Sequence, residues 1–249
     1  MVRRVRTISA LAGVSAVAVL SAPSAGAATN LGETFDPPSF CATDTTYLVT
    51  GSVGNTYTVP FDGVISGWSF QTGSFAPESI RLKIGRVTTG TDLSAPSTDL
   101  SVAGQSASEV PAESSLNTFS TQVSVQQGDF LGIYLGPGGG AQCSDSSRLG
   151  FPDHFNNSEV LAGTSDSFDR EEEGQINLAA VLEPDTDHDG FGDETQDACP
   201  SNATTQDVCP SPPVQPQTVK KKKKCKKHKK KHRSAESAKK KKCKKKKKR

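Results

Sequence analysis

Between about residue 30 and residue 184, apolar and polar residues alternate with a period of two, which restricts this segment to strands with one buried face. Within it, no ten-residue stretch repeats its apolar residues at the helical period. The alternating positions are Tyr57, Val59 and Phe61; Ile80, Leu82 and Ile84; Phe119, Thr121, Val123 and Val125; Leu131, Ile133 and Leu135; and Ile176, Leu178, Ala180 and Leu182. A helical bundle or a coiled coil is therefore excluded.

Turn-forming residues separate these runs, including Asp-Gly at 62–63, Gln-Gly-Asp at 127–129 and a Gly-Pro stretch at 136–140. Several short strands joined by such turns predict an all-β fold. We expect an antiparallel, jelly-roll-like β-sandwich over residues 28–184, a segment long enough to bury one hydrophobic core.

The same pattern predicts three details of this sandwich. Residues 123–135, with a Gly-Asp turn at their centre, are expected to form a hairpin that crosses the core. Arg81 and Lys83 alternate with the apolar residues of their strand, so they point away from the face that those residues form. Trp68 shares a face with apolar neighbours, which favours a place in the core over a platform that stacks on a sugar.

The N-terminus is typical of an export signal spanning residues 1–27. Three arginines within residues 3–6 precede an apolar stretch at 8–20, and small residues at 25–27 suit a signal peptidase. Thirteen helical residues span about 20 Å, which is too short for a hydrocarbon core of about 30 Å. The alternative is an uncleaved N-terminal anchor. A secreted, extracellular and cell-surface-associated protein is the expectation.

The cysteine count agrees with export, because an even number, here six, is expected of disulfides in an oxidising compartment. Cys41 and Cys143 are the only cysteines within the predicted sandwich, so their position favours a bridge that closes a loop of about 100 residues. Six cysteines allow fifteen pairings. Cys225 and Cys243 are expected to pair with each other or with another chain.

Charge divides the chain sharply. Residues 28–219 hold five basic and 26 acidic residues, a net charge of −21, whereas residues 220–249 hold 21 basic residues and one acid, a net charge of +20. Prolines make residues 210–219 an extended linker. The tail has almost no apolar residues, so we expect it to be disordered alone and to bind polyanions. Its candidate polyanion-binding residues are Lys220, Lys221, Lys222, Lys223, Lys224, Lys226, Lys227, Lys229, Lys230, Lys231, Lys239, Lys240, Lys241 and Lys242.

Catalytic signals are weak. His154 is the only histidine before residue 188, and its neighbour Asp153 could orient it as a base, but a histidine in such a loop is more often a surface residue. No serine lies in a Gly-x-Ser-x-Gly elbow. Three consecutive glutamates at 171–173 suggest a solvated turn or, alternatively, a second cation site. We predict no enzymatic activity.

Residues 185–200, DTDHDGFGDETQDACP, carry the most specific motif. Aspartates at positions 1, 3 and 5 of a tight loop can converge on one cation, and the glycine at position 6 allows the turn that aims the next carbonyl inward. The oxygen-only ligand set favours Ca²⁺ over Zn²⁺. The candidate metal ligands are Asp185, Asp187, Asp189, the carbonyl of Phe191, Asp193 and Asp197, with Glu194 as the alternative to Asp197. An acidic linker without a metal is the competing interpretation.

This stretch resembles a thrombospondin type-3 calcium repeat over residues 185–209, about a tenth of the chain. The matching residues are Asp185, Asp187, Asp189, Gly190, Gly192, Asp193, Asp197, Cys199 and Pro200. The resemblance implies an aspartate-rich loop that wraps Ca²⁺ with little hydrophobic core and is held by cysteine pairs. The sequence departs from the repeat at position 12, where Gln196 replaces the last acidic ligand and Asp197 follows one place late.

A bridge between Cys199 and Cys209 would close a short loop and stabilise this segment together with the metal. A β-domain followed by this loop and a lysine-rich tail also looks like a group of secreted actinobacterial proteins, a resemblance that assigns no activity.

Three function classes remain. The sequence favours an exported, calcium-binding structural or adhesive protein of the cell envelope, whose tail attaches to anionic wall polymers or lipid headgroups, with no specific nucleic acid bound. Self-association through the acidic domain of one molecule and the tail of another is a further expectation. The alternatives are an extracellular carbohydrate-binding module, by analogy of fold, and a secreted hydrolase, which would need His154 beside a serine and a carboxylate in a pocket.

Overall fold

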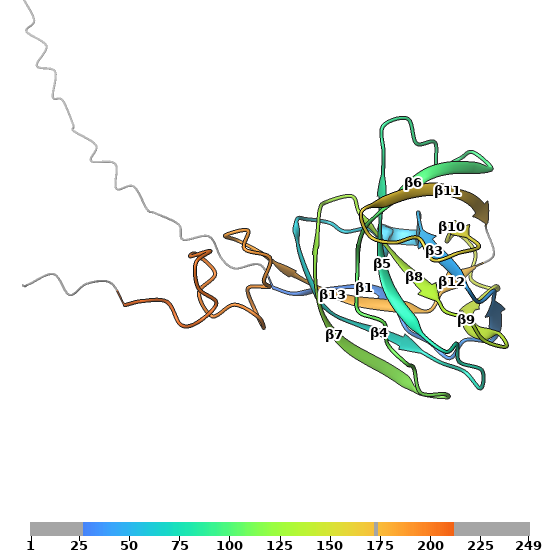
Figure 1. Cartoon of the computed structure of the whole chain (residues 1–249), viewed down its shortest axis with the longest axis horizontal. Helices are drawn as coiled ribbons and strands as arrows, with labels where there is room; N and C mark the ends of the chain where they lie inside the picture. The colour runs from blue at the N-terminus through green and yellow to red at the C-terminus, as the bar shows by residue number, and fades with distance from the viewer. Residues whose placement is uncertain (1–26, 172–173, 212–249) are drawn as a thin grey trace, which may run out of the picture. The chain divides into compact units, whose positions relative to one another are not determined.

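The computed structural model of the chain describes residues 27–171 and 174–211 (Figure 1). This part of the chain is all-β and contains no α-helix. Its strands are β1 (Thr29–Glu33), β2 (Ser39–Cys41), β3 (Thr45–Val49), β4 (Gly63–Gln71), β5 (Ile80–Val87), β6 (Ser97–Gln105), β7 (Leu116–Val125), β8 (Phe130–Leu135), β9 (Ala141–Asp145), β10 (Asp153–Asn156), β11 (Thr164–Glu171), β12 (Gln175–Ile176) and β13 (Leu178–Pro184), with one 3-10 turn at Val53–Asn55.

The predicted signal peptide, except for its last residue, the predicted linker from residue 212 onward and the predicted basic tail lie outside the described residues. Among residues 27–171 and 174–211, there is no helix that could span a membrane.

The strands pair in three sheets, and every pair is antiparallel, as the alternation predicted. One sheet has the order β1-β13-β4-β7, a second has the order β12-β9-β2, and six strands in the order β10-β11-β6-β5-β8-β3 close into a barrel. The expected jelly-roll-like sandwich is not confirmed, because six of the strands close into a barrel. The alternation did not predict this closure.

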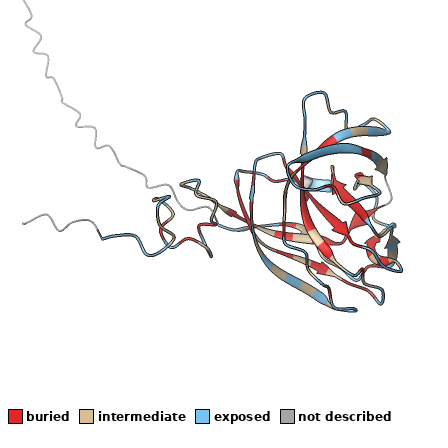
Figure 2. Cartoon of the chain, viewed as in Figure 1, coloured by how far each residue is buried: buried red, intermediate tan, exposed pale blue. Residues whose placement is uncertain are grey.

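The larger hydrophobic core joins the four-stranded sheet to one side of the barrel. It contains the alternating residues of the sequence pattern, among them Ile65, Trp68 and Phe70 of β4, Ile80, Leu82 and Ile84 of β5, and Leu131, Ile133 and Leu135 of β8. Trp68 is only 1% exposed and packs on Phe119 with ring centroids 4.8 Å apart, as expected of a core residue. Figure 2 shows this burial along the strands, whereas exposed residues alternate with partly buried ones along most of β7, an edge strand.

A second, smaller core fills the barrel and explains why it closes. Leu48, Leu100, Val102, Phe130, Val160 and Phe168 form this cluster, which uses the opposite faces of β3 and β8 from the larger core. Lys83 lies on that inner side of β5 and is fully buried. Its ammonium donates hydrogen bonds to Gln105 Oε1 at 2.7 Å, Glu159 Oε1 at 3.0 Å and the Val160 carbonyl at 2.9 Å, so the buried charge is paired.

Two predictions from the sequence are wrong. Residues 123–135 do not form a hairpin, because β7 pairs with β4 whereas β8 pairs with β3 and β5, so the turn at 127–129 connects two different sheets. His154 is not a surface loop residue but a fully buried residue of β10, where its Nδ1 lies 2.9 Å from the hydroxyl of Thr50.

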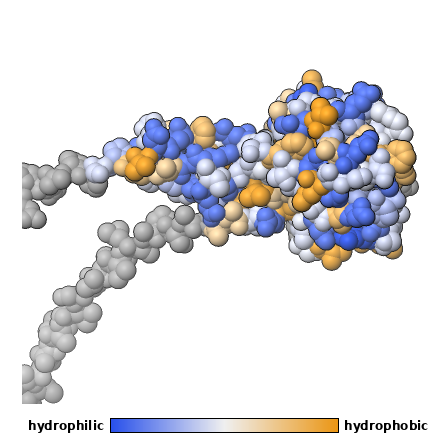
Figure 3. Space-filling model, turned by 90° about the horizontal axis from the view of Figure 1, so that it is seen from below, coloured by the Kyte–Doolittle hydropathy of each residue, from blue (hydrophilic) through white to orange (hydrophobic). Residues whose placement is uncertain are grey.

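Two disulfide bonds confirm the pairings that the sequence favoured. Cys41 and Cys143 join β2 to β9 across 102 residues, with their Cα atoms 5.8 Å apart, and Cys199 and Cys209 close a short loop with their Cα atoms 4.8 Å apart. Both separations lie in the usual range. On the face seen in Figure 3, hydrophobic residues lie among hydrophilic ones and form no single continuous patch.

Candidate metal centre

The acidic segment of residues 185–209 begins directly after β13, and its first turn is organised by Asp185. The amide of Asp189 donates to Asp185 Oδ1 at 3.1 Å, and the amide of Gly190 donates to Oδ2 at 2.9 Å. Gly190 has a φ of +85°, a conformation that glycine adopts without a steric penalty, and it therefore makes the sharp turn expected at the sixth position.

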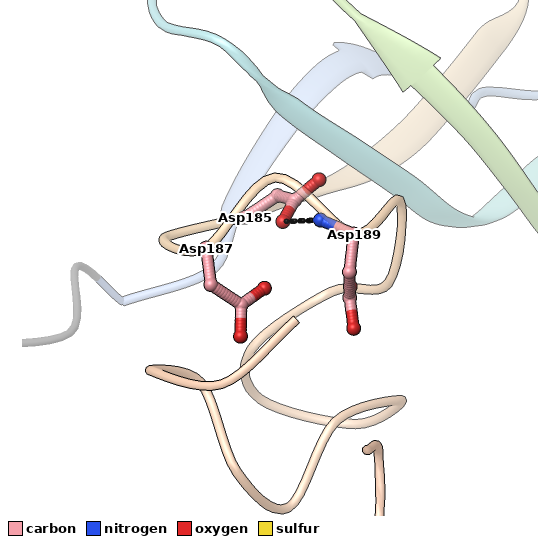
Figure 4. A group of neighbouring side chains, drawn as sticks. All are labelled: Asp185, Asp187 and Asp189. Carbon is pink, nitrogen blue, oxygen red and sulfur yellow. Dashed lines mark hydrogen bonds between the residues drawn. The ribbon is translucent and has the colours of Figure 1, made fainter. Parts of the chain in front are cut away.

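This turn brings Asp185, Asp187 and Asp189 together. One carboxylate oxygen from each lies within 4.8 Å of the others, and all three residues are partly buried. Figure 4 shows that the three side chains come from one tight turn and that Asp187 and Asp189 project to the same side of it. Asp189 is held in place, because the Phe191 amide donates to its Oδ1 at 2.9 Å and the Gln206 side chain donates to its Oδ2 at 2.8 Å.

Three carboxylate oxygens at this centre are shielded from solvent and lack a hydrogen-bond partner of normal geometry. Two belong to Asp187, and the third is Oδ2 of Asp197, a residue that is only 4% exposed. The two residues are electrostatic neighbours. Burial raises the pKa of Asp187, the charges of Asp189, Asp197 and Asp185 raise it further, and the backbone of Asn202 opposes the increase. Buried carboxylate oxygens are normally paired, so these three are oxygens that a cation could bind.

The other predicted ligands lie differently. The Asp193 carboxylate accepts hydrogen bonds from the amide and hydroxyl of Thr186, so it stabilises the turn rather than joining the triad. The Glu194 carboxylate accepts a hydrogen bond from the Ala28 amide at 2.8 Å, which directs it toward the start of β1. Asp197 Oδ1 accepts from the Cys199 amide at 2.7 Å, whereas Oδ2 is buried without a hydrogen-bond partner.

A buried glutamate of β13 fixes the segment to the β-domain. Glu183 is fully buried, and its carboxylate accepts the Glu194 amide at 3.0 Å, the Thr195 amide at 2.9 Å and the Thr195 hydroxyl at 2.6 Å. Burial works against the charged form, but hydrogen bonds from Ser66, Thr195 and Glu194 outweigh it and lower the pKa of Glu183. The carboxylate therefore stays ionised and holds the turn at residues 194–195.

Two glutamines attach the same segment to the edge strand β7. Gln196 Nε2 donates to the Thr121 carbonyl at 2.8 Å, and its Oε1 accepts the Gly192 amide at 3.1 Å. Gln122 Nε2 donates to the Gly190 carbonyl at 2.7 Å. Sequence reasoning missed both of these contacts and Glu183. The signal for Gln196 was its presence where the calcium repeat has an acidic ligand, because an amide can both donate and accept.

A hollow and a disulfide-closed loop adjoin the carboxylate triad. A hollow of about 520 Å³ is lined by Asp185 and Asp189 together with residues that include Arg86 and Gln126. The loop closed by the Cys199–Cys209 disulfide carries Gln206, which bonds to Asp189. The disulfide thus restricts the loop whose Gln206 holds the Asp189 side chain.

Of the remaining predicted sites, His154 lies within the described residues and the lysine-rich tail does not. The polyanion-binding lysines of residues 220–249 lie outside the described residues, as do Glu172 and Glu173. Within the described residues, the hydrogen-bonding partner of the His154 ring is Thr50, and the ring's other nitrogen, Nε2, is buried without one. Burial, with the charge of Arg170, lowers the pKa of His154.

No protein-family model matches the chain, and comparisons with curated proteins and with solved structures found no similar protein. The arrangement of its own carboxylates is therefore what indicates the chemistry of this centre.

Proposed function

We propose that the acidic segment binds one Ca²⁺ through Asp185, Asp187, Asp189 and Asp197, completed by the Phe191 carbonyl and water. The observation that supports this most strongly is the set of buried carboxylate oxygens on Asp187 and Asp197 that lack a hydrogen-bond partner of normal geometry. Asp193 then acts through Thr186, by holding the turn that presents the ligands. The resemblance to a thrombospondin type-3 repeat supports the same metal.

The spacing of the triad fits this ion. Ca²⁺ binds oxygen at 2.3–2.6 Å, so two ligands of one ion lie at most about 5 Å apart. The oxygens of Asp185, Asp187 and Asp189 lie within 4.8 Å of one another, which is inside that limit, so one ion can contact all three residues after local adjustment. A site made only of oxygen donors favours Ca²⁺ over Zn²⁺, which prefers histidine and cysteine.

Calcium would stabilise the junction that follows the β-domain. Residues 183–197 contain seven acidic residues and neither lysine nor arginine, so the metal-free segment is destabilised by its own charge. The bonds of Glu183, Gln196 and Gln122 connect this segment to β13 and β7. We therefore propose a structural role, in which the ion makes the end of the β-domain rigid.

Limited proteolysis tests the calcium site. Trypsin is unsuitable because residues 174–219 contain neither lysine nor arginine, so a protease that cleaves after acidic residues is the suitable reagent. Calcium should slow cleavage within residues 185–209, and chelation should restore it. Asp187→Asn should abolish the protection, whereas Asp207→Asn, at an exposed carboxylate in the loop closed by Cys199 and Cys209, should keep it. Equal cleavage with and without calcium would refute the proposal.

For the whole protein, we propose an exported structural or adhesive protein of the cell envelope, with no catalytic role. Two disulfides are typical of an oxidising compartment. The charge of +20 on residues 220–249 suits binding to anionic wall polymer or lipid headgroups, and the acidic domain would be repelled by the same surface.

A wall-fraction pull-down tests the adhesion. The chain should bind at low salt and release steeply as salt rises, because binding to a polyanion frees counterions. Removal of residues 220–249 should abolish binding and leave the β-domain folded. Binding that survives the truncation would contradict this role for the tail.

A carbohydrate-binding module is the second candidate, and a hollow of about 320 Å³ favours it. The hollow is lined by Phe40, Tyr47 and Phe155 together with polar groups that include Asp153 and Asn157, a combination of apolar faces and hydrogen-bonding groups that suits a sugar. A glycan array with the chain and its Phe155→Ala variant would test it. A glycan lost in the variant supports the candidate, and the absence of any bound glycan counts against it.

A further inference from the structure

The N-terminal end of β1 lies beside the acidic segment. The register of β1 with β13 places Thr29 opposite Leu182, so the residue before Thr29 lies next to the point where β13 ends and the acidic segment begins. There the backbone nitrogen of Ala28 donates to Glu194 Oε1 at 2.8 Å, across 166 residues of sequence. The contact is exposed to solvent, and its donor belongs to the backbone.

This contact lies in a strongly negative environment. Residues 183–197 carry seven carboxylates and neither lysine nor arginine. Arg81, Lys83, Arg86 and Arg148 form ion pairs with carboxylates that all lie outside the acidic segment. A positive charge at the nitrogen of Ala28 would be well placed to reduce this imbalance.

We infer that Glu194 binds the α-ammonium group of Ala28, which is created when the chain is cleaved after Ala27. The inference rests on the proposed export and not on the proposed calcium site. Hydrolysis of the Ala27–Ala28 peptide bond by a signal peptidase consumes one water molecule. The water oxygen joins the carbonyl carbon of Ala27, which leaves as a carboxylate, and the nitrogen of Ala28 becomes an ammonium. A neutral amide hydrogen bond thereby becomes a charge-assisted one.

This pair gives maturation a structural consequence. The ammonium would engage Glu194 Oε1 at the start of β1, whereas Asp197 Oδ2 has no hydrogen-bond partner. The pair also joins the residue before β1 to the segment after β13. A chain that keeps Ala27 carries its ammonium about one residue length, roughly 3.5 Å, farther along the chain and cannot place it on Glu194 in the same register.

A double-mutant cycle tests the pair. The chain beginning at Ala28 and the chain that retains Ala27 are each released from a cleavable N-terminal fusion, with and without Glu194→Gln. Thermal unfolding is followed at low salt in the presence of a chelator. The chain beginning at Ala28 should unfold about 1–3 °C higher than the chain retaining Ala27, a shift of the size expected of an exposed ion pair in a chain of this length. Glu194→Gln should remove the difference.

The controls distinguish charge pairing from a general effect of the extra residue. The exposed Glu113, in the turn before β7, is the matched control, and Glu113→Gln should leave the difference intact. Salt at 1 M should reduce the difference, because it shortens the screening length to about 3 Å. A difference that persists in Glu194→Gln would overturn the inference. A mature exported protein whose first residue, determined by mass spectrometry, is not Ala28 would overturn it as well. Neither result depends on calcium.

Discussion

Replacing Glu183 with glutamine tests whether one buried carboxylate holds the acidic segment on the β-domain. Three hydrogen bonds reach this carboxylate from residues 194 and 195, at 3.0, 2.9 and 2.6 Å. A hydrogen bond to a charged group contributes about 1.5–3 kcal/mol, against about 0.5–1.5 kcal/mol for a neutral pair. Glutamine keeps the shape but loses the charge, and its lower desolvation penalty offsets part of the loss. The segment should therefore be held less tightly by about 1–3 kcal/mol.

Amide hydrogen exchange measures this change directly, since 1.4 kcal/mol corresponds to a factor of ten. In Glu183→Gln, the amides of Glu194 and Thr195 should exchange roughly 5- to 150-fold faster, while amides in the barrel keep their protection. Glu113→Gln, which alters an exposed carboxylate, should change neither set. Unchanged protection at residues 194 and 195 would refute the reasoning, and so would an equal loss of protection throughout the domain.

Gly192→Ala should also weaken the segment, because a Cβ atom there would lie 2.5 Å from the Glu183 carboxylate, and hydrogen exchange would show faster opening at residues 194–195. Replacing Cys41 and Cys143 together with serine should lower the free energy of unfolding by about 3–5 kcal/mol in urea titrations, because their bridge closes a loop across 102 residues; an unchanged midpoint would count against this. Because the pKa of His154 is lowered in the folded state, the unfolded state binds a proton first, so stability should fall as pH drops through about 6.5. His154→Gln should reduce that pH dependence, and an identical dependence in both proteins would show that other groups cause it.

The strands were largely predictable from the sequence, because alternation of apolar and polar residues with a period of two matches a β-strand with one buried face. The apolar positions of Ile80, Leu82 and Ile84 all lie in the larger core, and so does Trp68. Antiparallel pairing followed from the short, turn-rich connections.

Closure of the barrel was not predictable from the same pattern. Alternation indicates that one face of a strand is buried, but it does not predict whether other elements cover the opposite face. Lys83 points away from the larger core as expected, yet it enters a second one, where Gln105, Glu159 and the carbonyl of Val160 satisfy its ammonium. The burial of Lys83 depends on which distant strands pair to close the barrel. For the same reason, the turn at 127–129 resembled a hairpin turn although its two strands belong to different sheets.

At the candidate metal centre, the sequence located the cluster but not the role of every residue in it. The spacing of Asp185, Asp187 and Asp189 corresponds to the group that the structure brings together. Asp193 and Glu194 instead make hydrogen bonds to Thr186 and Ala28. Ligand spacing cannot reveal such alternatives, because they depend on which donors the rest of the fold brings close.

Calorimetric titration of calcium into the mature chain beginning at Ala28 tests the central claim most directly. The proposed site predicts one bound Ca²⁺ with a Kd on the order of 10⁻⁴–10⁻³ M, the range of extracellular modules. Asp187→Asn should remove that binding, because it takes a charge from the residue whose two oxygens lack partners. The absence of any Asp187-dependent heat at calcium concentrations well above this millimolar range would mean that residues 185–209 are an acidic linker and not a calcium site.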